Sequence, residues 1–183
     1  MTRWFEDIPV GETFDMGNHT FTTEEIIAFG RDYDPQYFHV DPEAAKQSHF
    51  GGLIASGWHT IAMGHRKMVD TLMLEEERLR AEGMEPGISG PSPGVNHMNF
   101  RVPVRPGDTL TYRMRVREKR PSRSLPGWGV LVTMVSATNQ NGQEVYNLET
   151  VGFSRLRDYK PSIKERLGLI AMQVPFLKGL IRR

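Results

Sequence analysis

Residues 53–82 read LIASGWHTIAMGHRKMVDTLMLEEERLRAE and carry a long regular pattern. Mostly apolar side chains recur there at three- and four-residue spacings, which is typical of the buried face of an α-helix. This face would comprise Ile54, Trp58, Ile61, His65, Met68, Val69 and Leu72. A charged run at residues 75–78 gives the distal end a solvated surface, and Gly83 is a residue type that commonly ends helices. We therefore predict one long helix over residues 53–82.

Period-two patterns follow this helix, after a loop at residues 87–94 that is rich in glycine, proline and serine. The expected strands lie at residues 98–104, 110–116, 130–137 and 145–153. In the first two, apolar and polar side chains alternate as in half-buried strands. Asn141-Gly142, between the last two, is a strong hairpin signal. A long helix followed by an antiparallel meander predicts an α+β fold, with the helix packed on one face of the sheet.

Two short helical segments are expected before the long helix. Thr22 followed by Glu25 is a capping-box signal, and the apolar face after it ends where Gly30 would end a short helix. Asp41 followed by Pro42 repeats the pattern of an N-cap with a proline at the first helical position. The loop between these two segments would then be held close to both.

Composition limits the classes of function. A chain of 183 residues with 38% hydrophobic content suits one domain with a real core. A formal net charge of +1 gives no global field of the kind that nucleic-acid binders use. The absence of cysteine excludes disulfides, thiolate metal sites and cysteine nucleophiles, and it suits a reducing compartment. Acids stand near the first residue where a signal peptide would be apolar, so a cytoplasmic location is expected.

Asp34-Pro35-Gln36-Tyr37-Phe38-His39 is the candidate catalytic segment, in which the proline disfavours regular helix. A histidine titrates near neutral pH, and a neighbouring carboxylate can orient its ring or hold the far side of a shared water. Such a pair can deliver and remove protons on one small substrate. The same residues also suit a turn in which Asp34 bonds to backbone while His39 packs.

Two downstream segments add to this pair: residues 50–60, FGGLIASGWHT, and residues 100–110, FRVPVRPGDTL. Together with Asp34 and His39 they resemble the MaoC-like dehydratases, the R-specific enoyl-CoA hydratases of the hotdog fold. In that family an aspartate is followed five positions later by the catalytic histidine, usually with asparagine and proline between them. Here Gln36 stands where the family often has asparagine, and the proline has moved to position 35.

The resemblance implies a single hotdog domain over residues 1–158 and a C-terminal extension over residues 159–183. It implies reversible hydration of a trans-2-enoyl-CoA to an (R)-3-hydroxyacyl-CoA, with Asp34 and His39 acting on water. The thioester oxygen gathers charge as an enolate forms, and the Gly57 N–H at the helix start is the expected donor. The acyl-CoA would be the substrate, with no cofactor and no metal. Open sheet edges and the family both favour a homodimer or a higher oligomer of dimers.

Residues at the start of the long helix admit more than one role. The glycines at 51, 52 and 57 suit close approach of substrate or tight packing of helix on sheet. Ser56 suits a helix cap, a substrate contact or simply a small side chain, and the cap is favoured. Trp58 suits the floor of an acyl pocket or the core, and the core is favoured. The expected contacts with substrate from this region are those of Gln36, Ser56 and Trp58.

Histidines and cations elsewhere also admit two interpretations. His59 and His65 fall on different faces of the long helix, so packing or a polar contact at the pocket wall is expected for each rather than a metal site. The basic residues Arg117, Lys119 and Arg120 are typical of a solvated strand end, but they also suit the phosphates of coenzyme A. Nucleic acid is not expected as a partner, because no aromatic residues interleave with these charges.

Two rival functions fit the same fold. Hotdog acyl-CoA thioesterases often carry a catalytic acid near the start of the central helix, whereas the first acid here is Asp70, which disfavours that class. A non-catalytic acyl-CoA-binding protein would be favoured if Asp34 and His39 did not share a cleft. The tail from Pro161 to Arg183 is too short and too interrupted to span a bilayer. We expect it to pack on its own protein or on a partner rather than on a membrane surface.

Overall fold

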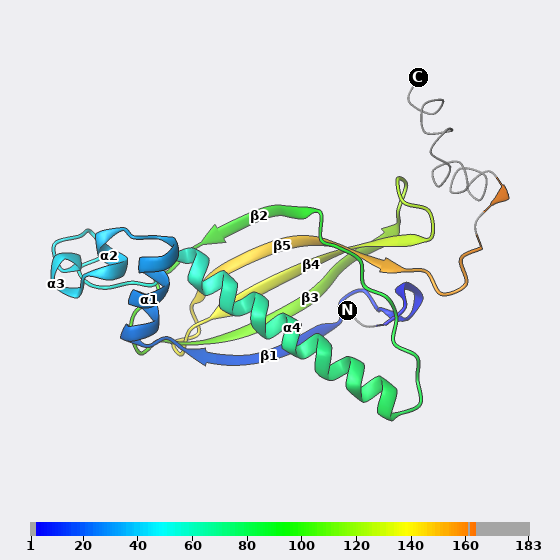
Figure 1. Cartoon of the computed structure of the whole chain (residues 1–183), viewed down its shortest axis with the longest axis horizontal. Helices are drawn as coiled ribbons and strands as arrows, with labels where there is room; N and C mark the ends of the chain where they lie inside the picture. Colours follow the sequence, from blue (N-terminus) through cyan, green and yellow to red (C-terminus); the bar gives the residue numbers. More distant parts are fainter. Residues whose placement is uncertain (1–2, 161, 164–183) are drawn as a thin grey trace, which may run out of the picture.

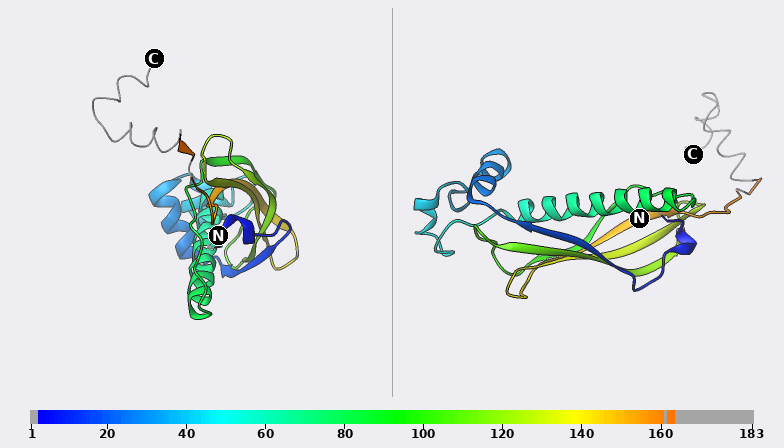
Figure 2. Two further views of the ribbon diagram at one scale, coloured as in Figure 1. Left: turned by 90° about the vertical axis from the view of Figure 1, so that its right-hand side faces the viewer. Right: turned by 90° about the horizontal axis from the view of Figure 1, so that it is seen from below.

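The computed structural model describes residues 3–160 and 162–163. An antiparallel sheet of five strands, in the order β1-β3-β4-β5-β2, curves around one long helix, α4 (Figures 1 and 2). In chain order the elements are η1 (Phe5–Asp7), β1 (Thr13–Thr20), α1 (Thr23–Tyr33), α2 (Tyr37–Val40), α3 (Pro42–Ala45), α4 (Gly57–Ala81), β2 (Gly94–Phe100), β3 (Thr109–Pro121), β4 (Trp128–Thr138) and β5 (Glu144–Arg155). The predicted α+β layout, with a helix packed on one sheet face, is confirmed.

The main core lies between α4 and the sheet. Strand β3 contributes the apolar set that its period-two pattern predicted, and each of these side chains is at most 2% exposed: Leu110, Tyr112, Met114 and Val116. The helix approaches this layer closely at Gly64, where an added Cβ would lie 2.1 Å from the Tyr146 hydroxyl oxygen. The position of α4 against the sheet therefore depends on that glycine.

Helix α4 begins at Gly57, later than the sequence pattern predicted. Residues 53–56 lie outside the helix, because the backbone there is bonded to other segments: the Ile54 N–H donates to the Phe38 carbonyl at 3.1 Å and the Ala55 N–H to the Val104 carbonyl at 2.8 Å. Apolar spacing does not separate helix from such a segment, since a short buried apolar run looks the same in both. The other end is as predicted, with Gly83 in the left-handed region at φ +74° after the last turn.

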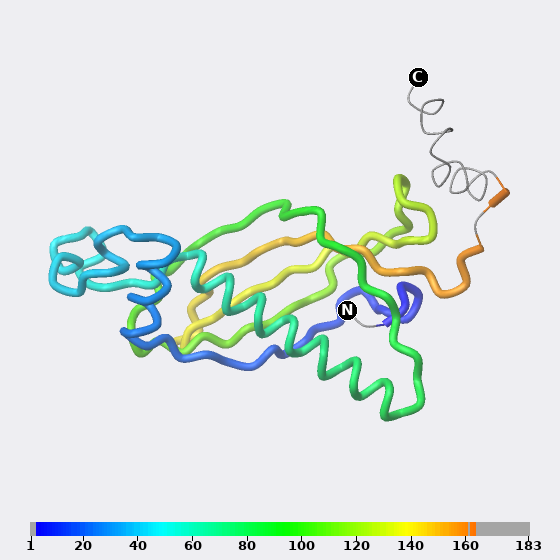
Figure 3. The backbone as a smooth tube through the Cα atoms, in the orientation of Figure 1, coloured from blue at the N-terminus to red at the C-terminus, as the bar shows by residue number. Residues whose placement is uncertain are grey.

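Helices α1, α2 and α3 form an overhang at one end of the sheet, beside the start of α4 (Figure 3). Helix α1 begins at the predicted cap, where Thr22 Oγ1 accepts from the Glu25 N–H at 3.2 Å. It continues past Gly30 to Tyr33, so the predicted end was wrong. Gly30 is a packing position instead, because an added Cβ would lie 2.8 Å from the His39 carbonyl oxygen. The overhang is thus packed closely around its two catalytic candidates.

Strand β2 is an edge strand that pairs only with β5, and most of its residues are exposed. The strand predicted over residues 98–104 is shifted, because β2 spans Gly94–Phe100. Just beyond it, the Arg101 N–H still donates to the Val145 carbonyl of β5 at 2.8 Å, but regular pairing has ended. Strands β4 and β5 meet at the predicted turn, where Gly142 has φ +75°. Sequence periodicity therefore located the strands but not all of their ends.

Two findings concern the membrane and the tail. Among the helices of the described residues, none combines the length and the apolar character needed to cross a bilayer. The predicted packing of the C-terminal extension falls almost entirely outside the described residues, which end at Ile163.

Candidate active site

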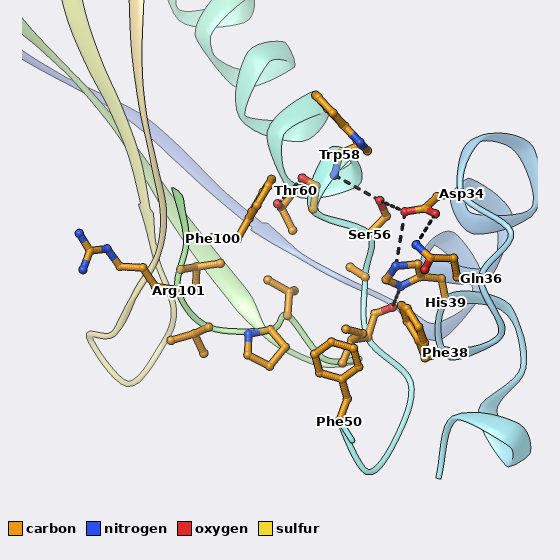
Figure 4. A pocket seen from close by; sticks show the side chains of 17 residues that line it. Asp34, Gln36, Phe38, His39, Phe50, Ser56, Trp58, Thr60, Phe100 and Arg101 are labelled. Atoms are coloured by element: carbon orange, nitrogen blue, oxygen red, sulfur yellow. Dashed lines mark hydrogen bonds and ion pairs between the residues drawn. The ribbon is translucent and has the colours of Figure 1, made fainter. Parts of the chain in front are cut away.

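His39 lies in α2 and is fixed by its neighbours (Figure 4). Its side chain is 6% exposed, and Nδ1 lies 2.7 Å from the Ile54 carbonyl oxygen. Because a carbonyl oxygen only accepts, Nδ1 must carry a proton and donate it. The other ring nitrogen, Nε2, faces Asp34, with 3.4 Å between Nε2 and Asp34 Oδ2. The imidazole is thus held with its free nitrogen toward the carboxylate.

Asp34 follows the last residue of α1, and both of its carboxylate oxygens accept hydrogen bonds. The Gln36 amide donates to Oδ1 at 2.8 Å, and the Ser56 hydroxyl donates to Oδ2 at 2.7 Å. Partial burial acts to raise the pKa of Asp34, but the two hydrogen bonds and the charge of a protonated His39 outweigh it and lower the pKa below its usual value. Asp34 is therefore a carboxylate at neutral pH.

Ser56 joins the catalytic candidates to helix α4. Its hydroxyl oxygen accepts from the Trp58 N–H at 3.2 Å, which confirms the predicted helix cap. The same hydroxyl donates to Asp34, and the side chain is 1% exposed. No sequence pattern indicated this second bond, because 22 positions separate the two residues and only the fold brings them together. The helix cap and one hydrogen bond to the Asp34 carboxylate therefore both depend on the Ser56 hydroxyl group.

Gly57 is the first residue of α4, where backbone N–H groups have no partner within the helix. Within the part of the chain that the structure describes, nothing accepts a hydrogen bond from the Gly57 N–H. An added Cβ at this position would lie 2.6 Å from Cζ of Phe100. The close approach of Phe100 supports the interpretation that this glycine serves packing. Its N–H group, which has no acceptor among the described residues, remains available beside the pocket.

A pocket of about 390 Å³ lies against these residues, between the overhang, the start of α4 and the chain after β2 (Figure 4). Its floor is apolar and buried: Ile54, Ala55, Val104 and Val145. Phe38, Phe50 and Phe100 form walls that sequence reasoning missed, because their distance along the chain gives no signal of a shared cavity. Asp34 and His39 both line this pocket, so the cleft that an enzymatic function requires is present.

Trp58 also lines the pocket, but it is 61% exposed, so the favoured interpretation of a core aromatic was wrong. Trp58 stands in the first turn of α4, and its side chain points to the side of the helix away from Phe100 (Figure 4). Its side chain is open to a ligand.

The cations expected to contact coenzyme A lie elsewhere. None of Arg117, Lys119 and Arg120 lines the pocket, and all three lie toward the end of β3 that is remote from the overhang (Figure 1). Arg117 pairs with Glu149, and Lys119 donates to the carbonyl oxygen of Phe5 at 3.1 Å. The structure therefore does not bring these three residues to the pair of catalytic candidates.

The expectation that the histidines of α4 stand at the pocket wall was wrong, because neither His59 nor His65 lines the pocket. His59 is 6% exposed and stacks on Phe29 with 4.5 Å between ring centroids, while His65 is exposed. Across residues 3–160 and 162–163, no group of three or more histidine, cysteine or acidic residues is placed to hold a metal ion.

Comparison with known proteins shows which family this chain resembles. The family described as MaoC like domain matches residues 7–136. The chain belongs to this family. The protein YdeM of Bacillus subtilis (strain 168) is 31% identical to it over 144 residues, which cover 79% of this chain and 93% of YdeM.

Solved structures agree with this assignment. A MaoC-like dehydratase from Rhodospirillum rubrum is 33% identical, with a TM-score of 0.67, and the match covers 87% of this chain and 99% of that one. The R-hydratase PhaJ1 from Pseudomonas aeruginosa is 18% identical, with a TM-score of 0.57 and coverage of 88% of this chain and 96% of that one; at this identity the likeness shows the fold. The hotdog fold is thus confirmed. Membership of a dehydratase family supports a hydro-lyase in general terms.

Proposed function

We propose that this protein reversibly adds water to a trans-2-enoyl-CoA and forms an (R)-3-hydroxyacyl-CoA. One observation carries the proposal: an ionised Asp34 and the free Nε2 of His39 face each other in a pocket, beside an open helix N–H. Hydration of a conjugated thioester needs a group that moves a proton and a donor for the developing oxyanion. Both kinds of group converge here.

His39 is the proposed proton carrier. The hydrogen bonds to Asp34 keep that carboxylate a weak base, so the role of proton acceptor is assigned to Nε2 of His39, which faces it. As the water oxygen bonds to the β-carbon, Nε2 takes one proton from that water. The same proton then passes from Nε2 to the α-carbon, so both hydrogen and oxygen come from one water and the enzyme returns to its initial state. Asp34 stabilises the imidazolium that exists between these steps.

The Gly57 N–H is the proposed donor to the thioester oxygen. Negative charge collects on that oxygen as the β-carbon gains its new bond and the enolate forms. An N–H at a helix start is oriented in advance and lies at the positive end of the helix dipole, so it stabilises such charge without rearrangement. The chemistry assigned to these residues requires no cofactor or metal.

The rival thioesterase activity is less well supported. Asp34 is the only carboxylate among the residues that line the pocket, and no acid stands in the first turns of α4. Hydrolysis would need a nucleophile or a base aimed at the carbonyl carbon, whereas Asp34 already accepts two hydrogen bonds from protein groups. A water activated by His39 suits addition to the β-carbon better.

A homodimer is part of this proposal. Strand β2 leaves one edge of the sheet unpaired, and two apolar side chains at the pocket rim, Trp58 and Phe100, are 61% and 50% exposed. A second copy that pairs along β2 would cover the edge and narrow the mouth of the pocket. Light scattering that finds an active monomer at low concentration would contradict this.

The test of the function is a panel of trans-2-enoyl-CoA substrates of increasing chain length, incubated with the purified protein. We expect loss of the conjugated thioester absorbance and, on chiral chromatography, a 3-hydroxyacyl product of R configuration. Release of free thiol from saturated acyl-CoA without hydration would favour the thioesterase. Binding without turnover of any member of the panel would favour a non-catalytic acyl-CoA-binding protein.

A further inference from the structure

One arginine lines the pocket among the residues that the structure describes, and it is not part of the predicted basic run. This residue, Arg101, lies at the end of the pocket away from Asp34 and His39 (Figure 4). Its side chain is 58% exposed. A substrate that reaches from the catalytic pair toward solvent along this groove would meet Arg101 on its way out.

The chain from Arg101 to Arg105 is organised with two different sides. Val102 and Val104 are partly or fully buried and line the pocket, whereas the alternate residues Arg101, Pro103 and Arg105 are exposed. Arg101 and Arg105 thus stand at the two ends of one exposed edge, the segment whose buried residues line the pocket.

The side chains of both arginines make few contacts, so some of their N–H donors stay available. Arg101 Nε pairs with Glu144 Oε1 at 2.7 Å. Arg105 Nη2 donates to the Phe50 carbonyl at 2.6 Å, which ties it to a wall of the pocket. A guanidinium has five N–H donors, so each side chain can keep its present contact and still bind an anion.

We propose that Arg101, with Arg105 beside it, forms the phosphate-recognition edge of this site and selects thioesters that carry a phosphorylated carrier. The inference rests on the proposed function, because the thioester end is set by Asp34 and His39. It assigns phosphate contacts to the edge that adjoins the pocket rather than to Arg117, Lys119 and Arg120. Arginine suits this role, since its planar fork binds phosphate through two parallel hydrogen bonds.

The carboxylate of Glu144 opposes phosphate binding at Arg101. It lies next to Arg101 and repels a phosphate that approaches the same guanidinium. Glu144 also accepts from the Asn147 amide at 2.6 Å, and a glutamine at this position retains an acceptor oxygen for that bond. Replacement by glutamine should therefore strengthen phosphate binding, while loss of Arg101 weakens it.

The experiment compares trans-2-butenoyl thioesters of N-acetylcysteamine, 4′-phosphopantetheine and coenzyme A. For Arg101→Ala we expect KM with the coenzyme A thioester to rise about tenfold with kcat little changed, as for loss of a charged hydrogen bond, and KM with the N-acetylcysteamine thioester to stay as in wild type. Glu144→Gln should lower KM for the thioester whose phosphate Arg101 binds and leave KM for the N-acetylcysteamine thioester unchanged. Arg117→Ala is the matched control and should leave KM unchanged for both the coenzyme A and the N-acetylcysteamine thioester. An effect that appears already with 4′-phosphopantetheine assigns Arg101 to the phosphate that carrier proteins share; one confined to coenzyme A assigns it to the nucleotide phosphates.

Equal losses with all three thioesters, or no loss with coenzyme A, would overturn the proposal. Arg101→Lys, which keeps the charge, distinguishes these results from a folding defect, because it should recover part of the affinity. Titration calorimetry with free coenzyme A and with pantetheine gives an answer that does not need turnover. If wild type hydrates no thioester but binds coenzyme A more tightly than Arg101→Ala does, the proposed function fails while the phosphate edge stands.

Discussion

Replacement of Ser56 by alanine removes two interactions at once. The hydroxyl caps α4 by accepting from the Trp58 N–H at 3.2 Å, and it donates to Asp34 Oδ2 at 2.7 Å. Loss of an N-cap costs about 1 kcal/mol. Loss of a hydrogen bond to a charged group costs about 1.5–3 kcal/mol. Because Ser56 is buried and water does not replace the hydroxyl easily, we expect Ser56→Ala to lower the free energy of unfolding by about 2–4 kcal/mol.

The same substitution changes the response to pH. The Ser56 hydrogen bond helps to hold the pKa of Asp34 below its usual value, so its removal raises that pKa. A carboxylate with a lowered folded pKa contributes stability above its unfolded pKa of about 3.9 and loses it as the pH falls through the folded pKa. The stability difference between wild type and Ser56→Ala should therefore shrink in acid, as the pH falls through the folded pKa of Asp34.

Urea denaturation at several pH values measures these effects. Thr22→Ala is the matched control, because Thr22 caps α1 at the same distance of 3.2 Å but does not touch Asp34. It should cost about 1 kcal/mol at every pH. Ser56→Thr keeps a hydroxyl group and should recover part of the lost stability. A stability difference between wild type and Ser56→Ala that stays the same from neutral pH into acid would refute the coupling of cap to carboxylate.

Two further substitutions test the packing around α4. Gly64→Ala should destabilise the fold by about 1–3 kcal/mol in urea denaturation, because the new Cβ would lie 2.1 Å from the Tyr146 hydroxyl oxygen; a melting temperature equal to that of wild type would contradict this contact. Burial lowers the pKa of His59, so the unfolded chain binds a proton that the folded protein does not, and stability should fall as the pH drops below about 6.5. His59→Phe, which keeps a ring against Phe29, should lose less stability between pH 7 and pH 5 than wild type, and an equal loss would mean that another group causes it.

Periodicity and cap signals predicted most of the fold. The apolar repeat in residues 53–82 predicted the long helix, and the alternation in residues 110–116 predicted a strand whose apolar face is fully buried. These predictions hold because each pattern reports which side of an element is buried. The errors at Gly30 and at the start of α4 have the opposite origin, since contacts with distant backbone decided both.

The candidate site was predictable only in part. Asp34 and His39 lie close together in sequence, and their spacing, taken with two downstream segments, carried the family resemblance that indicated a catalytic pair. The bond from Ser56 to Asp34 and the cation at Arg101 depend on how the overhang and the chain after β2 meet α4. No local sequence pattern indicates these contacts between segments that are far apart in the chain. For the same reason the sequence could not separate the cations that adjoin the pocket from those at the far end of β3.

The central claim is that Asp34 and His39 carry the chemistry. It is tested most directly by kcat/KM for trans-2-butenoyl-CoA in Asp34→Asn and in His39→Asn, with circular dichroism and melting temperature measured on the same samples. Asparagine at 39 provides an N–H donor of similar reach for the Ile54 carbonyl, so the fold should persist. We expect each variant to lose about a hundredfold or more in kcat/KM, as positioned acid–base groups typically contribute. Near-normal hydration by either folded variant would contradict the assignment.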